Sequence, residues 1–264
     1  MNKLQVRGLQ IAYTEKGAGT PIVLLHGALS DSRTWKNEIA DLSENYHVVA
    51  WDTPGCGRSS DPPETYSLTD YAECLASLIE HLELDRPHIL GLSFGGGLAL
   101  ELYRIYPKIP GSLILVSAYA GWAGSLPARE VEERLQNGLK QSEMSPEQVV
   151  NNWLPTLFTD STPVDVVKKS ANIMSDFHPA GMRTMLRAFA KADLSGMLPD
   201  IKVPVLLLYG DADQRSPLHI AQKLHSDIPS SKLVVIEGVG HVVNAEAPEK
   251  FNTVVREFLA SIDS

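Results

Sequence analysis

Short apolar runs recur along the chain, separated by stretches in which apolar residues return every three or four positions. The runs that are apolar at nearly every position are PIVLLHG, HVVAWD, PHILGLS, SLILVS, PVLLLYG and KLVVIEG. Such runs are typical of parallel strands whose two faces are both covered by helices. Ahead of them, LQVRG and LQIAYTE alternate apolar and polar residues, which predicts an antiparallel hairpin at an edge of the sheet.

The stretches between these runs predict helices. Residues 68–84, 94–106 and 248–262 have helical spacing, and the last of them places Phe251, Val255 and Leu259 on one face. Strands that alternate with helices indicate an α/β fold with a doubly wound, mostly parallel sheet.

The alternation stops between residues 121 and 195, where helix-like segments follow one another without a strand. The sheet pattern resumes near Val203. We therefore predict a core domain formed by residues 1–120 and 196–264, and an all-helical cap inserted at residues 121–195. Such a cap would lie as a lid over the site that the sheet presents.

Charge and composition narrow the classes of partner. The 264 residues carry a formal net charge of −9 with both signs interspersed, so the phosphates of a nucleic acid would be repelled. No apolar run approaches the roughly 18 residues of a membrane span, and the N-terminus does not read as a signal peptide. Cys56 and Cys74 give neither a disulfide framework nor a metal-ligand spacing. We expect a cytoplasmic protein that uses no metal ion and acts on a small molecule.

The segment HILGLSFGGG contains the pattern G-x-S-x-G, with Ser93 between Gly91 and Gly95, directly after an apolar run and before a predicted helix. A sharp strand-to-helix turn of this kind exposes the serine Oγ above the sheet, and small neighbours let the backbone pass. The N–H of Phe94, at the positive end of the helix dipole, stays free to face a developing oxyanion. These features make Ser93 the candidate nucleophile.

A serine hydroxyl is a weak nucleophile until a base takes its proton, and a histidine, with an unperturbed pKa of about 6.5, suits that task. Of the eight histidines, His241 follows the last predicted strand. It therefore lies at the same edge of the sheet as Ser93, where ligands bind in sheets of this type. The strand before it is followed by two carboxylates, Asp211 and Asp213, and periodicity does not choose between them.

Five segments resemble, in order and context, those of the α/β-hydrolase fold superfamily: LLHGALSDSRTW, WDTPGCGRSSDPP, GLSFGGG, GDADQRSP and GVGHVVNAEAPEKF. The resemblance extends from about residue 9 to about residue 259, apart from the cap. It implies the chain order nucleophile, acid, histidine, and hence a triad of Ser93, an aspartate and His241.

The resemblance also bears on the choice of the acid. Gly210, Asp213 and Pro217 match the superfamily pattern G-x-x-D-x-x-x-P. Asp213 also lies farther out on the loop and so reaches towards the histidine of the next strand. We take Asp213 as the acid and expect Asp211 to brace the turn through backbone N–H groups.

Two further sets of residues are expected around Ser93. The resemblance implies that the loop after the His-Gly pair supplies a second oxyanion donor besides Phe94, the backbone of Ala28, with Leu29 as the alternative. The expected lining of the substrate pocket consists of Leu29, Trp122, Trp153, Arg183 and Met185.

A predicted helix that opens at Pro179 carries an apolar stripe beside a basic one, which includes Arg183 and Arg187. In the simplest interpretation the apolar stripe packs the cap on the core and the basic stripe is solvated. A sharper hypothesis is that Arg183 or Arg187 turns inward to hold a substrate carboxylate.

Together these features favour a serine hydrolase that cleaves a small carboxylic ester or lactone without a cofactor. Carbon–carbon hydrolases of ring-cleavage products and perhydrolases resemble the chain in layout, but the former usually carry asparagine where this chain has Leu92. A second class is a small-molecule sensor that keeps a hydrolase scaffold. The sequence leaves both monomer and homodimer open.

Overall fold

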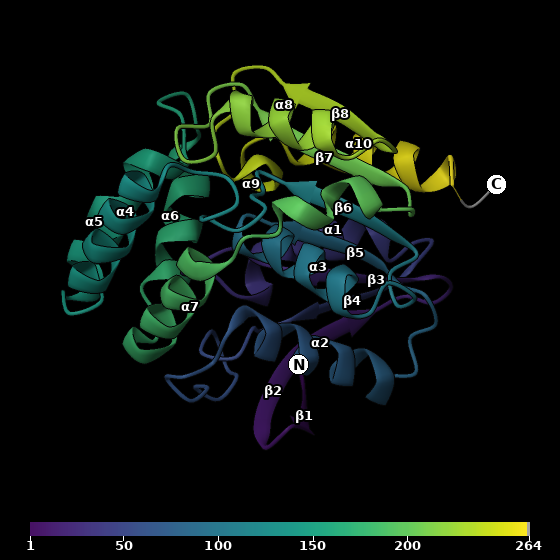
Figure 1. The fold of residues 1–264 in the computed structure, drawn as a ribbon, viewed down its shortest axis with the longest axis horizontal. Helices are drawn as coiled ribbons and strands as arrows, with labels where there is room; N and C mark the ends of the chain where they lie inside the picture. Colours follow the sequence, from purple (N-terminus) through teal and green to yellow (C-terminus); the bar gives the residue numbers. More distant parts are fainter. Residues whose placement is uncertain (263–264) are drawn as a thin grey trace.

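The computed structural model describes residues 1–262, and within them one eight-stranded sheet forms the centre of the molecule (Figure 1). The sheet order is β1-β2-β4-β3-β5-β6-β7-β8. β1 pairs with β2 and β2 with β4 in antiparallel register, whereas every other pair is parallel. The mostly parallel α/β sheet and its N-terminal edge hairpin are therefore confirmed. The strands are β1 (Asn2–Val6), β2 (Leu9–Lys16), β3 (Pro21–Leu25), β4 (His47–Trp51), β5 (His88–Leu92), β6 (Ser112–Val116), β7 (Val205–Gly210) and β8 (Ser231–Ile236).

Helices cover both faces of this sheet. In Figure 1, α2 (Leu68–His81), α3 (Phe94–Ile105) and α8 (Leu218–Asp227) lie in front of the strands, and α1 (Lys36–Leu42) and α10 (Pro248–Ala260) lie behind them. Every residue of β5, β6 and β7 is buried, as their apolar runs predict. β8 differs, because it is an edge strand: of its six residues three are half-buried, two are exposed and only Ile236 is buried.

Between β6 and β7 the chain forms four helices in succession and no strand. They are α4 (Ala128–Gln141), α5 (Pro146–Leu157), α6 (Val164–Met174) and α7 (Pro179–Lys191). Figure 1 shows them gathered together at one side of the sheet. We call residues 121–195 the cap. That the cap behaves as a separate unit or as a moving lid stays a prediction.

Local sequence sets the start of several of these helices. The side chain of Ser67 accepts the N–H of Asp70, and the Asp70 carboxylate accepts the N–H of Ser67, so that α2 begins with a capping box. α7 begins at Pro179, where the fixed φ of proline suits the first turn of a helix. Within residues 1–262 no helix combines the length and the apolar character needed to cross a membrane.

Candidate active site

Ser93 occupies a sharp turn between β5 and α3. Its backbone has φ 54° and ψ −111°, a conformation that residues with a side chain rarely adopt. Only glycine fits at the two flanking positions, because a Cβ there would clash with the backbone. A Cβ on Gly91 would lie 2.2 Å from the carbonyl oxygen of Gly95, and a Cβ on Gly95 would lie 2.2 Å from that of Leu25 in β3. The G-x-S-x-G pattern therefore allows the strand, the turn and the helix to pack in direct contact beneath the serine.

The residues expected to supply the oxyanion donors lie around the same cavity as Ser93. The N–H of Phe94 is the first of α3 and so has no acceptor within its own helix. Ala28 and Leu29 follow β3 and border the same cavity as Ser93 and Phe94. Leu29 has φ 56°, in the left-handed region that favours glycine. The strained residue is therefore Leu29, the alternative donor, next to Ala28. That either of them donates to an oxyanion stays a prediction.

Of the two carboxylates after β7, Asp213 contacts His241. The Nδ1 of His241 lies 2.8 Å from Oδ2 and 3.0 Å from Oδ1 of Asp213, and both side chains are buried. The backbone N–H groups of Arg215 and Ser216 both donate to Oδ1, each at 2.8 Å. Since a carboxylate only accepts, the proton of the imidazole resides on Nδ1 and leaves Nε2 able to accept one.

The surroundings of Asp213 keep it ionised. Burial alone would raise the pKa of its carboxyl group. The charge and hydrogen bond of His241 and the N–H of Ser216 outweigh burial, so that the pKa lies below its ordinary value of 3.8.

Asp211 serves the turn instead. It is exposed, and its Oδ1 accepts the N–H of Gly238 at 2.6 Å, which connects the loop after β7 to the loop after β8. The two carboxylates that follow β7 therefore have different contacts: Asp211 connects the two loops, and Asp213 contacts His241.

A cavity joins these groups. It encloses about 820 Å³ of empty space, including open solvent at its mouth, which is within the usual range for small-molecule sites. Ser93 and His241 both border it. Most of its wall is apolar or aromatic, and the cap contributes much of that surface. Among the lining residues are Leu29, Leu92, Trp122, Trp153, Leu157, Phe158, Met174, Met185, Leu186 and Phe189.

A sequence profile described as the Alpha/beta hydrolase family matches residues 22–254. The chain belongs to the alpha/beta hydrolase family. It is 27% identical over 250 residues to the (E)-2-((N-methylformamido)methylene)succinate hydrolase of Acinetobacter baylyi, covering 94% of this chain and 93% of that protein. It is 28% identical over 249 residues to 3-oxoadipate enol-lactonase 1 of the same organism, covering 92% of this chain and 90% of that one.

Among solved structures, this alpha/beta hydrolase is similar to a thermophilic esterase from Thermogutta terrifontis, determined with malate bound. The two superimpose with a TM-score of 0.92 at 26% sequence identity, covering 100% of this chain and 99% of the esterase.

The structure contradicts one expectation for the pocket of this alpha/beta hydrolase. Leu29, Trp122, Trp153 and Met185 border the cavity, but Arg183 does not. Its guanidinium lies 3.8 Å from the carboxylate of Glu64, on the side of α7 that faces the loop before α2. The apolar stripe of α7 turns inward, so the basic stripe on its opposite side cannot reach the cavity.

Two other arginines border the cavity, Arg134 of α4 and Arg215 of the loop after β7. The sequence could have indicated that Arg215 lies near the site, because this residue belongs to the segment GDADQRSP and follows Asp213 by two positions. Arg134 carries no such signal, since it is one of several charged residues on a strongly polar helix.

The cap is tied directly to the loop that carries the histidine. The carbonyl oxygen of Leu157, the last residue of α5, accepts the backbone N–H of His241 at 2.9 Å. The Glu246 carboxylate accepts the N–H of Gly240 at 2.8 Å and the hydroxyls of Thr159 and Thr162, both in the cap. The position of His241 therefore depends on the cap as well as on the sheet.

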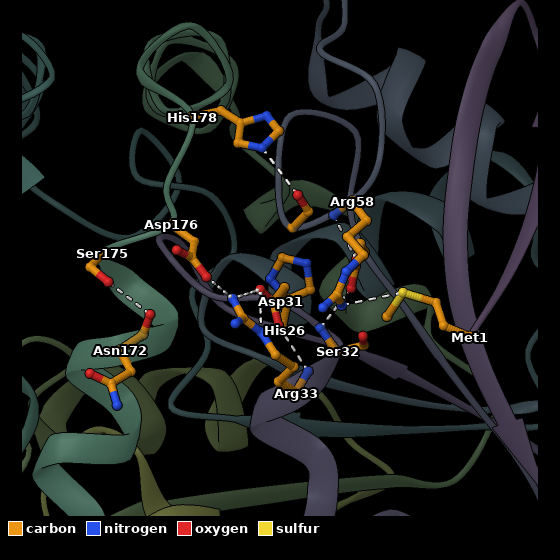
Figure 2. A network of polar contacts seen from close by, with 12 residues as sticks. Met1, His26, Asp31, Ser32, Arg33, Arg58, Asn172, Ser175, Asp176 and His178 are labelled. Atoms are coloured by element: carbon orange, nitrogen blue, oxygen red, sulfur yellow. Dashed lines mark hydrogen bonds and ion pairs between the residues drawn. The ribbon is translucent and has the colours of Figure 1, made fainter.

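A second polar connection links the cap to the loop after β3 (Figure 2). Arg33 lies between two carboxylates: its Nη2 is 2.6 Å from Oδ2 of the buried Asp31 and 2.8 Å from Oδ2 of Asp176, which follows α6. His178 of the cap, which Figure 2 also shows, has its Nδ1 2.6 Å from Oδ1 of Asp61 in the core. These contacts hold the cap against the core close to Ala28 and Leu29.

His26 has a structural environment. Its Nδ1 donates to the carbonyl oxygen of Gly27 at 2.8 Å, and its Nε2 accepts the N–H of Thr53 at 2.9 Å. Burial lowers the pKa of this imidazole, so it stays neutral and connects the loops after β3 and β4. Within residues 1–262 no group of three or more histidine, cysteine or acidic side chains is arranged to hold a metal ion.

Proposed function

We propose that this alpha/beta hydrolase is a serine hydrolase that cleaves a small carboxylic ester or lactone through an acyl-enzyme intermediate. The observation that carries the proposal is that His241, which is paired with Asp213, borders the same cavity as Ser93 in its strained turn. The names of two similar proteins, an enol-lactonase and an esterase, support the same class of reaction.

In the proposed reaction, the Oγ of Ser93 attacks the substrate carbonyl carbon while Nε2 of His241 takes the hydroxyl proton. Asp213 stabilises the imidazolium, and the backbone N–H groups of Phe94 and Ala28 donate to the oxyanion. The intermediate then collapses, the carbon–oxygen bond to the alcohol breaks, and His241 gives its proton to the leaving oxygen. A water molecule, deprotonated by the same histidine, attacks the acyl carbon and releases the acid and the free serine.

Removing one oxyanion donor typically costs about 10²- to 10³-fold in rate. Because both proposed donors are main-chain groups, side-chain substitution at Ala28 by another small residue should change little. This separates the proposed donors from the triad, in which side chains carry the chemistry.

The test follows release of p-nitrophenol from acetate, butyrate and octanoate esters, with Ser93→Ala beside the wild type. Ser170→Ala is the matched control, because Ser170 also borders the cavity but lies on α6 of the cap, away from the turn between β5 and α3. We expect turnover by the wild type and by Ser170→Ala, and loss of at least about 10⁴-fold in Ser93→Ala.

If the wild type leaves all three esters intact, simple ester hydrolysis is the wrong class. Turnover of a ring-cleavage diketone would then assign carbon–carbon hydrolysis. Tight binding of a small molecule without turnover would assign a sensor that retains the scaffold.

A further inference from the structure

Arg215 extends into the cavity from the same turn that supplies Asp213. Its backbone N–H donates to Oδ1 of Asp213 at 2.8 Å, which fixes where the side chain begins. Its guanidinium lies 4.0 Å from the centre of the Trp153 ring, and its Nη1 donates to Oγ1 of Thr156 at 3.0 Å. Both partners belong to α5 of the cap. The Trp153 ring is itself held, because its Nε1 donates to Gln141 at 2.6 Å.

The charge of Arg215 has no carboxylate partner. In the part of the chain that the structure describes, no acidic oxygen lies within ion-pair distance of its guanidinium, and one of its five N–H donors has a side-chain acceptor. Arg134, the other arginine at the cavity, differs in this respect. Its Nη2 lies 2.7 Å from Oε1 of Glu130, and its Nη1 donates to the Tyr119 hydroxyl at 3.0 Å.

A cation in this position costs free energy, because the cavity replaces water with apolar and aromatic groups. Burial lowers the pKa of Arg215 to about 10, which still leaves the guanidinium charged at neutral pH. Its direct contacts, a tryptophan face and a threonine hydroxyl, do not neutralise it, and Arg134 is a second cation beside it. The carboxylate of Asp213 attracts it from a distance but is paired with His241. A bound anion would neutralise it.

The charged side chains that line the cavity favour a bound anion. Among the described residues that border the cavity, none is aspartate or glutamate, although the whole chain has a net charge of −9. Arg134 lies directly behind Arg215, since its Nη1 and Nη2 each donate to the Arg215 carbonyl oxygen at 3.2 Å. The two guanidinium groups therefore create a local positive potential in an otherwise acidic protein.

We propose that Arg215 binds a carboxylate of the substrate, so that this enzyme acts on monoesters or lactones of dicarboxylic acids. The inference rests on the proposed function for its reaction and adds the class of substrate. One planar guanidinium fork with free donors matches a carboxylate in geometry and charge. The reacting carbonyl lies at Ser93, and the apolar wall between Ser93 and Arg215 holds the carbon chain that joins the two ends of the substrate.

The kinetic test compares two esters of equal length, monoethyl glutarate and ethyl hexanoate, in which an ethyl group replaces the carboxylate. Ethanol release is measured for the wild type, Arg215→Gln, Arg215→Lys and Arg187→Gln. Arg187 is the matched control, because its guanidinium lies on the outside of the cap, 3.8 Å from Glu64.

We expect the wild type to prefer the anionic ester in kcat/KM by on the order of 10- to 100-fold, the range of hydrogen bonds to charged groups. Arg215→Gln should remove this preference, mainly through KM, and Arg215→Lys should restore part of it. Arg187→Gln should keep the wild-type preference. Equal losses on both esters in Arg215→Gln would show that Arg215 only fastens the cap, and would overturn the proposal.

A binding measurement tests the site without turnover. Glutarate is titrated into Ser93→Ala and into Ser93→Ala/Arg215→Gln, and the fluorescence of the tryptophans is followed, since Trp153 stacks on Arg215. Saturable binding that needs Arg215, without hydrolysis of either ester by the wild type, would support the anion site and refute the proposed function. Hydrolysis without anionic preference or glutarate binding would refute the anion site and leave the proposed function standing.

Discussion

Replacing Asp213 by asparagine separates the role of its charge from that of its shape. Oδ1 of Asp213 accepts two backbone N–H groups, from Arg215 and Ser216, at 2.8 Å each. The amide oxygen of an asparagine can take over both of these bonds. Its NH₂ group must then occupy the place of Oδ2, which lies 2.8 Å from Nδ1 of His241.

Two donors cannot share that contact, so the imidazole of Asp213→Asn must move its proton from Nδ1 to Nε2. An Nε2 that already carries a proton cannot accept one from Ser93. In serine proteases the equivalent change lowers kcat by about 10⁴-fold, and we expect a loss of that size, corresponding to about 5 kcal/mol in the barrier.

The assay is kcat on a short p-nitrophenyl ester, with the midpoint of thermal unfolding as the control for folding. Asp211→Asn is the matched variant, because its amide oxygen can still accept the N–H of Gly238 from an exposed position. Its rate should stay within a factor of about 2 of the wild type. A folded Asp213→Asn that keeps a tenth of the wild-type kcat, or an equal loss in Asp211→Asn, would refute the assignment of the acid.

Three further predictions concern stability. Burial raises the pKa of Glu38 from 4.5 to about 8, so between these pH values the folded state holds a proton that the unfolded state loses. The wild type should therefore lose about 1.4 kcal/mol of unfolding free energy for each pH unit of increase in this range, and Glu38→Gln should not. The difference is measured from the unfolding midpoints of both proteins. Gly95→Ala forces a Cβ against a backbone carbonyl and should unfold in far less denaturant, whereas Gly196→Ala, with open space around it, should not. Arg33→Ala leaves the buried carboxylate of Asp31 without its ion-pair partner. It should lower the melting temperature more than Asp176→Asn, which removes an exposed ion pair worth at most about 1 kcal/mol.

The succession of strands and helices along the chain, and the position of Ser93 at the end of a strand, could be predicted from sequence because they depend on local patterns. Continuous apolar runs mark the covered strands, and the turn at Ser93 needs small residues on both sides. His241 could be placed at the same edge because it follows a strand. To predict these features it is enough to know that a residue lies at the end of a strand.

The lining of the cavity could be predicted only in part: Leu29, Trp122, Trp153 and Met185 border it as expected, but Arg183 does not. Which polar residues line it depends on how the cap helices pack over the sheet. Arg183 and Met185 are two positions apart on α7, yet Met185 borders the cavity and Arg183 contacts Glu64. Spacing defines the two faces of such a helix and does not say which arginine from another element reaches the cavity. Arg134 comes from α4 and Arg215 from the core, and their proximity exists only in the folded chain.

β8 illustrates the same distinction at the level of the sheet. Its sequence, KLVVIEG, has the apolar character of a covered strand, but the strand lies at the edge, where Val235 is exposed. An apolar run predicts that a strand forms. How much of the strand is buried depends on the strands and helices that pack against it.

The central proposal is that Ser93 forms a covalent bond to the acyl group. The most direct measurement is the mass of the intact protein and of its peptides after reaction with a fluorophosphonate, which labels activated serines. We expect one adduct, on the peptide that contains Ser93, and none in Ser93→Ala or within the same time in His241→Ala. An adduct on another residue, or ester turnover at the wild-type rate by Ser93→Ala, would contradict the proposal.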